Sequence, residues 1–420
     1  MRIRKQRLTS VAPLRKALHL LARPVKGSKG RSGIVIQPYR GFASEKKVFL
    51  VGRVFRQPGG GAGLRRGTLA RDIVDFIRRA LRWGVRHAVL EARFRGGIQR
   101  VRADRNGYFR VRMAPSREDI PGRLWQSMEL RLLWPESSGS SAKGSVFVIP
   151  KTARFVVISD IDDTVISTGV ANKVRMVWRM LLQRARKKIA FPGVAAFYRA
   201  LHRGITGEAR NPLLYVSRGP WAIYEILTEF FNLHNIPVGP ILFLREWGLT
   251  FQQPFPPPSK DHKLNLIRTM LESYKDLPFI LIGDSGQSDP EIYAQVVREH
   301  PGRVMAVYIR NVSLDPNRSK AVEELARQVV EAGSSLVLAS DTFSMASHAV
   351  DHGYIHAEDL PEILGERVDQ EGRTALQPTH AIEGSTPEEN LEALQKGELE
   401  KRLRGAIEGE PPPNIVLESK

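Results

Sequence analysis

Short apolar runs alternate with helical patterns over residues 151–355. The runs lie near residues 154–159, 212–217, 279–283, 303–309 and 335–339. Between the second and third runs, Leu264, Ile267 and Leu271 recur at the spacing of one helical face. Strands that alternate with helices in this way predict a parallel sheet covered by helices on both of its faces.

Residues 45–150 show a β pattern instead. Short strands are predicted at 48–55, 88–94, 109–113, 130–134 and 146–149, and the segment 104–109 is typical of a hairpin turn. We expect these strands to form a small β-sandwich, with a helix over residues 69–83 packed on it. The predicted organisation is a basic N-terminal segment (1–44), a β-sandwich-like domain (45–150), an α/β domain (151–360) and a polar acidic tail (361–420).

Composition and charge narrow this picture. The chain has 420 residues and no Cys, which excludes disulfides and thiolate metal sites. No run of about 20 apolar residues occurs, so no membrane-spanning helix is predicted. The net charge is +20, but residues 1–150 hold 33 Lys and Arg against nine Asp and Glu. Such an excess attracts acidic lipid headgroups or nucleic acid; the alternative is a soluble protein that is merely rich in Arg.

Candidate chemistry begins where the first apolar run of the α/β region ends. The sequence there contains Asp160, Asp162, Asp163 and Thr164. Carboxylates this close repel one another unless a cation holds them, and Mg²⁺ prefers carboxylate oxygen. One carboxylate could attack phosphorus while another exchanges a proton with the leaving group and with water. The alternative interpretation is a turn or helix cap, where Asp and Thr are both common.

Three later segments supply polar groups in an order that suits a phosphatase. Ser217 ends the second apolar run, and Lys263 opens the helical pattern that follows. The third run ends at Asp284, with Asp289 five residues further on. The carboxyl ends of parallel strands meet at one edge of a sheet, where such folds bind ligands. Taken alone, Ser217 is equally explained as part of a strand-end turn, and Lys263 is better explained as a solvated side chain.

A second group of potential ligands is weaker. His348, His352 and His356 are spaced by four, which could place three imidazoles on one helical face for zinc. Gly353 interrupts that helix, and no acidic ligands accompany the histidines, so we favour a structural role.

Together, the four segments resemble the ordered motifs of the haloacid-dehalogenase-like phosphatases. The stretch from Gly283 to Tyr293, Gly-Asp-Ser-Gly-Gln-Ser-Asp-Pro-Glu-Ile-Tyr, resembles more narrowly the actin-patch-protein type of phosphatidate phosphatase, as do Ser217–Trp221 and His262-Lys263. The resemblance covers about residues 45–355. It implies a Rossmann-like α/β domain of the haloacid-dehalogenase-like type. About 48 residues separate Thr164 from Leu213, too few for a large cap domain, so an open site is expected.

The resemblance also implies a role for each motif residue. Asp160 would be the nucleophile and a Mg²⁺ ligand, and Asp162 the acid/base, with its carbonyl also on the metal. Thr164 would position the loop, and Ser217 and Lys263 would bind the phosphoryl group. Asp284 would be a further Mg²⁺ ligand, with Asp289 supporting it or coordinating through water. Arg218 stands where relatives often carry Ser or Asn, and an arginine there would suit a phosphate.

The sequence thus predicts a Mg²⁺-dependent phosphatidate phosphatase that works through an aspartyl-phosphate. We expect a cytoplasmic protein, peripheral on an anionic membrane, and no nucleic-acid partner, because no aromatic stacking motif for single strands is found. Two alternatives stay open: a phosphatase of soluble phosphomonoesters, and a non-catalytic basic protein that binds lipid or nucleic acid.

Overall fold

The computed structural model describes residues 34–44, 47–56, 83–115, 123–135, 140–161, 192–217, 224–243, 260–313, 315–375 and 415–417. The described residues up to Ile149 form one compact unit, and most of those from Pro150 onward form a second. No helix among the described residues combines the length and apolarity needed to cross a membrane.

The first unit is built on one nine-stranded sheet. Its order is β1-β3-β2-β9-β8-β5-β6, and β4 and β7 also pair with β3. All pairs are antiparallel except β2 with β9. The strands are β1 (Ile34–Pro38), β2 (Gly41–Ala43), β3 (Val48–Arg56), β4 (Trp83–Gly84), β5 (Val89–Phe94), β6 (Gly97–Arg102), β7 (Tyr108–Met113), β8 (Trp125–Trp134) and β9 (Ser141–Val148).

Strand alternation places the core of this unit on one face of the sheet. Along β8, Met128, Leu130 and Leu132 are buried while Glu129 and Arg131 are exposed. The Arg112 backbone N–H in β7 donates to Gln99 Oε1 in β6 over 3.0 Å, which brings the two ends of the sheet together. The pairing therefore describes one curled sheet, and the predicted two-sheet sandwich is not confirmed.

The second unit contains a seven-stranded sheet, in the order β12-β11-β10-β13-β14-β15-β16. Its strands are parallel except β16, which runs antiparallel to β15. The five predicted strands are confirmed as β10 (Val156–Asp160), β11 (Leu213–Ser217), β13 (Phe279–Asp284), β14 (Val304–Arg310) and β15 (Ser335–Ala339). Two short strands were not predicted, β12 (Ile241–Phe243) and β16 (Ile415–Leu417).

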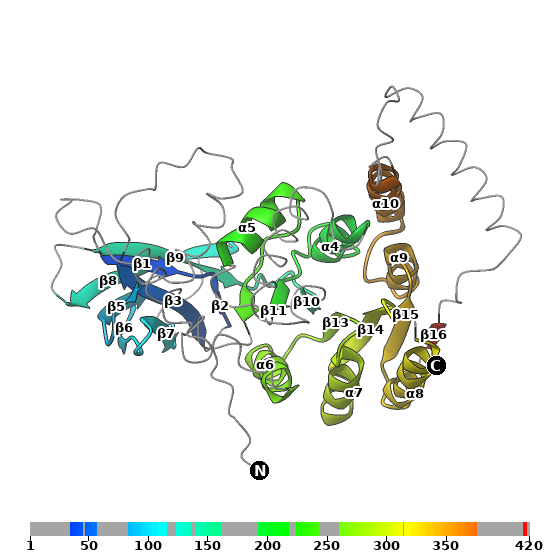
Figure 1. Ribbon diagram of the computed structural model, residues 1–420, viewed down its shortest axis with the longest axis horizontal. Coiled ribbons are helices and arrows are strands. Elements are labelled where there is room, and N and C mark those ends of the chain that lie inside the picture. Colours follow the sequence, from blue (N-terminus) through cyan, green and yellow to red (C-terminus); the bar gives the residue numbers. More distant parts are fainter. Residues whose placement is uncertain are drawn as a thin grey trace, which may run out of the picture. The chain divides into compact units, whose positions relative to one another are not determined.

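Helices cover both faces of the parallel sheet (Figure 1). One face carries α4 (Val194–Arg203), α9 (Thr342–Asp351) and α10 (Leu360–Ala375), and the other carries α6 (Lys260–Ser273), α7 (Asp289–Glu299) and α8 (Pro316–Glu331). The remaining helices are α5 (Tyr224–Leu233) and the short 3-10 helix η2 (Ala357–Asp359). Because both faces are covered, the strands are apolar at nearly every position, as Val156, Val157 and Ile158 are.

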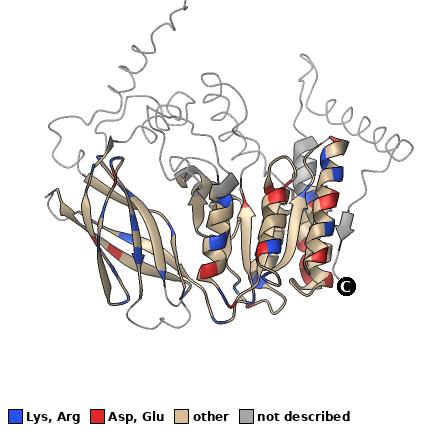
Figure 2. Ribbon diagram, turned by 90° about the horizontal axis from the view of Figure 1, so that it is seen from below, with Lys and Arg blue, Asp and Glu red and all other residues tan. Residues whose placement is uncertain are grey.

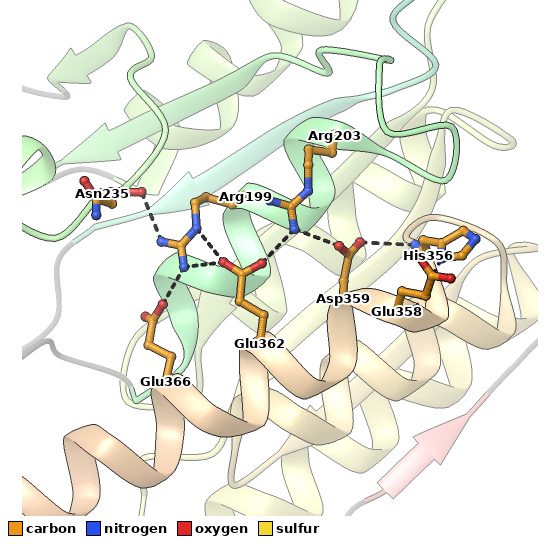
Figure 3. Close-up of polar contacts among 8 residues, drawn as sticks. All are labelled: Arg199, Arg203, Asn235, His356, Glu358, Asp359, Glu362 and Glu366. Atoms are coloured by element: carbon orange, nitrogen blue, oxygen red, sulfur yellow. Dashed lines mark hydrogen bonds and ion pairs between the residues drawn. The ribbon is translucent and has the colours of Figure 1, made fainter.

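Helix α10 extends beyond residue 360, where the sequence predicted the start of a solvated acidic tail. Ile363 is fully buried, and the acidic side chains of η2 and α10 pair with arginines of α4 (Figure 3). Arg199 Nη2 lies 2.8 Å from Glu362 and 2.7 Å from Glu366, and Arg203 Nη2 lies 2.7 Å from Asp359. The acidic residues recur every three or four positions, so they lie on one helical face that binds α4.

The histidine triplet does not form a metal site in the described residues. His348 Nδ1 lies 3.0 Å from the Tyr308 hydroxyl, and the His348 and His352 rings stack with centroids 4.0 Å apart. His356 instead caps η2. Burial, followed by the neighbouring His352, lowers the pKa of His348 to about 4.

This shifted pKa makes stability depend on pH. Between about pH 6.5 and 4, the unfolded chain protonates His348 more readily than the folded one does, so stability falls as the pH falls through this window. We expect His348→Gln to lose less thermal stability than the wild type between pH 7 and pH 4.5. The comparison is the melting temperature at several pH values, with exposed His356→Gln as the control. Parallel curves for all three proteins would contradict this assignment.

Candidate active site

The polar residues at the strand ends of the second unit lie along one edge of its sheet. Asp160 ends β10 beside Val216, the residue before Ser217 in β11. Asp284 ends β13 and pairs in register with Arg310 at the end of β14. Since neighbouring parallel strands end here, residues more than 100 positions apart in the sequence meet at one edge, as the sequence predicted.

Lys263 lies between two carboxylates of this cluster. Its Nζ is 2.9 Å from Asp160 Oδ2 and 2.5 Å from Asp289 Oδ1. The three side chains are between 0% and 2% exposed, so solvent screens their attraction little. Burial alone would lower the pKa of Lys263, but Asp160, Tyr293 and Asp289 raise it well above its usual value. Lys263 is therefore a permanent positive charge beside Asp160.

Tyr293 is a member of this cluster for which the sequence suggested no role. The Lys263 ammonium lies 5.3 Å from the centre of its ring, a cation–π distance. The Tyr293 hydroxyl donates to the Ile282 carbonyl over 3.0 Å, which ties α7 to strand β13. The aromatic ring thus closes the buried side of the Lys263 site.

Asp289 connects the lysine to the end of β13. Its Oδ2 accepts from the Asp284 backbone N–H at 3.3 Å, while Asp284 Oδ1 accepts from the Gly286 N–H at 2.8 Å. Gly283 permits this approach, because a Cβ built there would lie 2.4 Å from Asp289 Oδ2. These contacts hold Asp289 against both the Lys263 ammonium and the Asp284 backbone.

The donor set fits a divalent cation. Asp160, Asp284 and Asp289 each offer a carboxylate oxygen within 4.8 Å of the other two. Three carboxylates face one lysine, so negative charge is left over, and hard oxygen donors without Cys or His favour Mg²⁺ over zinc. Among the described residues, no other group of three or more acidic or histidine side chains lies close enough together to hold a metal.

Arg318 of helix α8 fixes the loop between Asp284 and Asp289. Its Nε donates to the Ser285 carbonyl at 2.6 Å and its Nη2 donates to the Gln287 carbonyl. The same guanidinium binds both oxygens of Glu291, at 2.5 and 3.1 Å. This role could not be predicted from the sequence, because an arginine in the first turn of a helix ordinarily faces solvent.

A cavity adjoins the acidic cluster. It is lined by Asp160, Ile161, Gly283, Asp284 and Arg310 at the strand ends and by side chains of α4 and α9, among them Tyr198, Thr342 and Met345. The Tyr198 hydroxyl is 2.6 Å from the Ser159 hydroxyl, and burial raises the pKa of Tyr198 to about 12. Tyr198 is therefore a neutral hydrogen-bonding group in the wall of the cavity at ordinary pH.

Several predicted features lie outside the described residues. They are Asp162, Thr164 and Arg218 of the predicted site, most of the basic segment 1–44, the predicted helix over residues 69–83 except Trp83, and residues 376–414 and 418–420 of the predicted tail. Of the predicted site residues that are described, Asp160, Lys263, Asp284 and Asp289 converge, and Ser217 is fully buried on the neighbouring strand.

Comparison with known proteins gives an independent view of this region. Residues 155–311 match the family model described as the catalytic domain of phosphatidate phosphatase APP1. The chain is 30% identical over 178 residues to phosphatidate phosphatase APP1 of Saccharomyces cerevisiae, covering 41% of this chain and 29% of that protein. It is 29% identical over 191 residues to an uncharacterised protein of Schizosaccharomyces pombe, covering 45% and 31%.

The solved structures resemble this chain only weakly. A carbohydrate acetylesterase from Xanthomonas citri is 12% identical and overlaps 69% of this chain and 72% of its own, with a TM-score of only 0.22. The informative matches are the two sequence relatives, and this chain spans less than a third of the length of either.

The acidic strand-end cluster, its buried lysine and the family model agree on one class, the phosphatase catalytic domains. Within that class, residues 155–311 match the family model of the phosphatidate phosphatase APP1 catalytic domain, so the resemblance seen in the sequence motifs is confirmed for this segment.

Proposed function

We propose that this chain is a Mg²⁺-dependent phosphatidate phosphatase, which converts phosphatidate into diacylglycerol and phosphate. The observation that carries the proposal is the placement of Lys263 between Asp160 and Asp289, with Asp284 beside them, inside the segment that matches the family. A buried lysine and three carboxylates are suited to neutralising and attacking a phosphate monoester.

In the proposed reaction, Asp160 is the nucleophile. A carboxylate oxygen of Asp160 forms a bond to phosphorus while the bond from phosphorus to the glycerol oxygen breaks. Asp162 gives that oxygen a proton, and diacylglycerol leaves. Water then attacks phosphorus and returns a proton to Asp162, which restores Asp160 and releases phosphate. Lys263 orients Asp160 through its Oδ2 and offsets charge on the phosphoryl group.

The metal proposal rests on the fit of the three carboxylates. Asp160 and Asp284 would hold Mg²⁺, and Asp289 would support them through Lys263 and the Asp284 backbone. When bound, the ion supplies positive charge to the equatorial phosphate oxygens. Ser217, at the end of the strand beside β10, would donate a hydrogen bond to one of those oxygens.

The choice of phosphatidate rests on the matched family and relative. The test is phosphate release from phosphatidate in mixed micelles, with and without Mg²⁺, next to short soluble phosphate esters and an Asp160→Asn control. Mg²⁺-dependent release from phosphatidate that the substitution abolishes supports the proposal. Release from soluble esters alone would keep the site and overturn the lipid substrate, and no release from either would overturn both.

The Arg318 contacts predict an effect on metal affinity. Arg318→Lys keeps the charge but loses the planar fork that binds two carbonyls and Glu291. We expect Mg²⁺ to bind about tenfold more weakly, as with other residues that orient metal ligands from behind. Isothermal titration with Mg²⁺ measures this without turnover.

Arg268→Lys is the matched control for this substitution. Arg268 of α6 likewise binds both oxygens of one carboxylate, that of Glu299 at the end of α7, at 2.8 and 2.6 Å. It should leave the Mg²⁺ affinity unchanged. Equal losses in the two variants would mean that Arg318 contributes only general stability.

A further inference from the structure

Strand alternation in the first unit turns a row of arginines outward. Val101 and Val111 point into the core of that unit, and their neighbours along β6 and β7 are exposed. Together with β5, these strands present five exposed arginines, which we call the arginine face: Arg93, Arg100, Arg102, Arg110 and Arg112. Figure 2 shows Lys and Arg in blue on strands of the first unit.

One strand ladder and one hydrogen bond bring these arginines near one another. In the β5–β6 ladder, Arg93 lies opposite Ile98 and Glu91 lies opposite Arg100. Strand β7 does not pair with β6 in a ladder, but the Arg112 backbone N–H donates to Gln99 Oε1 in β6 over 3.0 Å. Within a ladder, neighbouring strands lie about 4.8 Å apart and alternate residues about 7 Å apart, so the charges on β5 and β6 are spaced within about one Debye length and their potentials add.

Acidic partners on this part of the sheet are too few to neutralise it. Glu91 lies 2.7 Å from Arg93 Nη2 and 4.0 Å from Arg100 Nε. Across the described residues up to Ile149, 15 Lys and Arg accompany only three Asp and Glu. In the second unit, by contrast, both arginines of α4 form ion pairs with carboxylates of η2 and α10. The described part of the first unit therefore carries an excess of positive charge.

An exposed apolar side chain lies within this face. Ile98 is 61% exposed in β6, opposite Arg93 and two residues before Arg100. Guanidinium groups form paired hydrogen bonds to phosphate, and an aliphatic side chain among them can enter the acyl boundary of a bilayer. A nucleic-acid backbone offers phosphates but gives such an aliphatic side chain little to bind.

We propose that the arginine face, with Ile98, docks this protein on the surface of an anionic lipid bilayer. The recognised chemistry is a layer of phosphate-bearing headgroups above an apolar interior. This inference does not depend on the catalytic proposal, because binding is measurable on lipids that the site would not hydrolyse. Each arginine at such a surface strengthens partitioning about fivefold.

The test is flotation of the full chain with vesicles of 70% phosphatidylcholine and 30% phosphatidylserine in 0.1 M salt. We expect R100Q/R102Q/R112Q to bind about a hundredfold more weakly than the wild type, and Ile98→Ser to bind several-fold more weakly even at higher salt. The control R268Q/R298Q/R327Q removes three positive charges from the second unit and should bind nearly as the wild type does. Melting temperatures confirm that every variant is folded.

Each other outcome overturns the inference in a distinct way. Wild-type binding by R100Q/R102Q/R112Q, or equal losses in both triple variants, would show that this face is not the docking surface. Loss of duplex-DNA binding with unchanged vesicle binding would assign the face to nucleic acid. Hydrolysis of a short soluble phosphate ester, measured in parallel, should be the same in the wild type and R100Q/R102Q/R112Q, which separates docking from catalysis.

Discussion

Asp160→Asn is expected to abolish phosphate release while the protein remains folded. The amide has the shape of the carboxylate but cannot form the acyl phosphate, so we expect kcat to fall by at least about a thousandfold. The fold should tolerate the change because Lys263 keeps Asp289 as its partner at 2.5 Å. One negative charge also leaves a cluster that has an excess of them.

Two measurements check this expectation, phosphate release at saturating substrate and Mg²⁺ and the melting temperature without Mg²⁺. Asp351→Asn, an exposed carboxylate at the end of α9, is the matched control and should behave as the wild type does. If Asp160→Asn turned over at a near-native rate, another group would have to attack phosphorus. If Asp160→Asn lost activity only because the protein unfolds, the result would not support Asp160 as the nucleophile. It would also contradict the expectation that the fold tolerates this substitution.

Lys263→Met is expected to damage both stability and activity. Removing one partner from a buried ion pair leaves uncompensated charge, which typically costs about 3–5 kcal/mol. Here both Asp160 and Asp289 lose their cation in a site that is almost fully buried. The remaining carboxylates repel one another, so the folded variant takes up protons more readily than the unfolded chain. Its stability should therefore rise as the pH falls from 7 toward 5.

Urea unfolding at pH 7 and pH 5 measures these effects. The double variant Lys263→Met/Asp289→Asn should recover part of the lost stability, because one of the two buried carboxylates left without a positive partner is gone. It should not recover activity, since no lysine ammonium lies beside Asp160 to orient it and to offset charge on the phosphoryl group. Lys275→Met, an exposed lysine, is the control. A Lys263→Met protein as stable as the wild type at pH 7 would show that the buried pairs contribute no net stability.

The sheet of the second unit could be predicted from the sequence because its central strands are buried on both faces. Runs such as Phe279–Asp284 are apolar almost throughout, and that pattern is local. Strands β12 and β16 have three residues each, too few for any periodicity. In the first unit, β6 was not predicted because it has only two apolar side chains, Ile98 and Val101. Ile98 is exposed, so the strand shows no apolar alternation.

The site was predictable in its members but not in its connections. Asp160 and Asp284 stand out because carboxylates end apolar runs. Nothing local indicates that Asp289 accepts from both Lys263 and the Asp284 backbone, or that Gly283 leaves the room for it. Arg318 was missed for the same reason, since two of its partners are backbone carbonyls more than 30 positions away. Such contacts depend on the packing of α7 and α8 and carry no sequence signature.

Strand β16 protects the sheet of the second unit from self-association. Without β16, strand β15 (Ser335–Ala339), whose residues are all buried, would present a row of unpaired N–H and C=O groups. Such an exposed edge can pair with a strand of another chain. The antiparallel pairs Leu336 with Leu417 and Leu338 with Ile415 occupy that edge. A chain that ends after residue 375 would keep every described residue of the acidic cluster but would expose the edge of β15. We therefore expect such a chain to aggregate even though its site residues are intact.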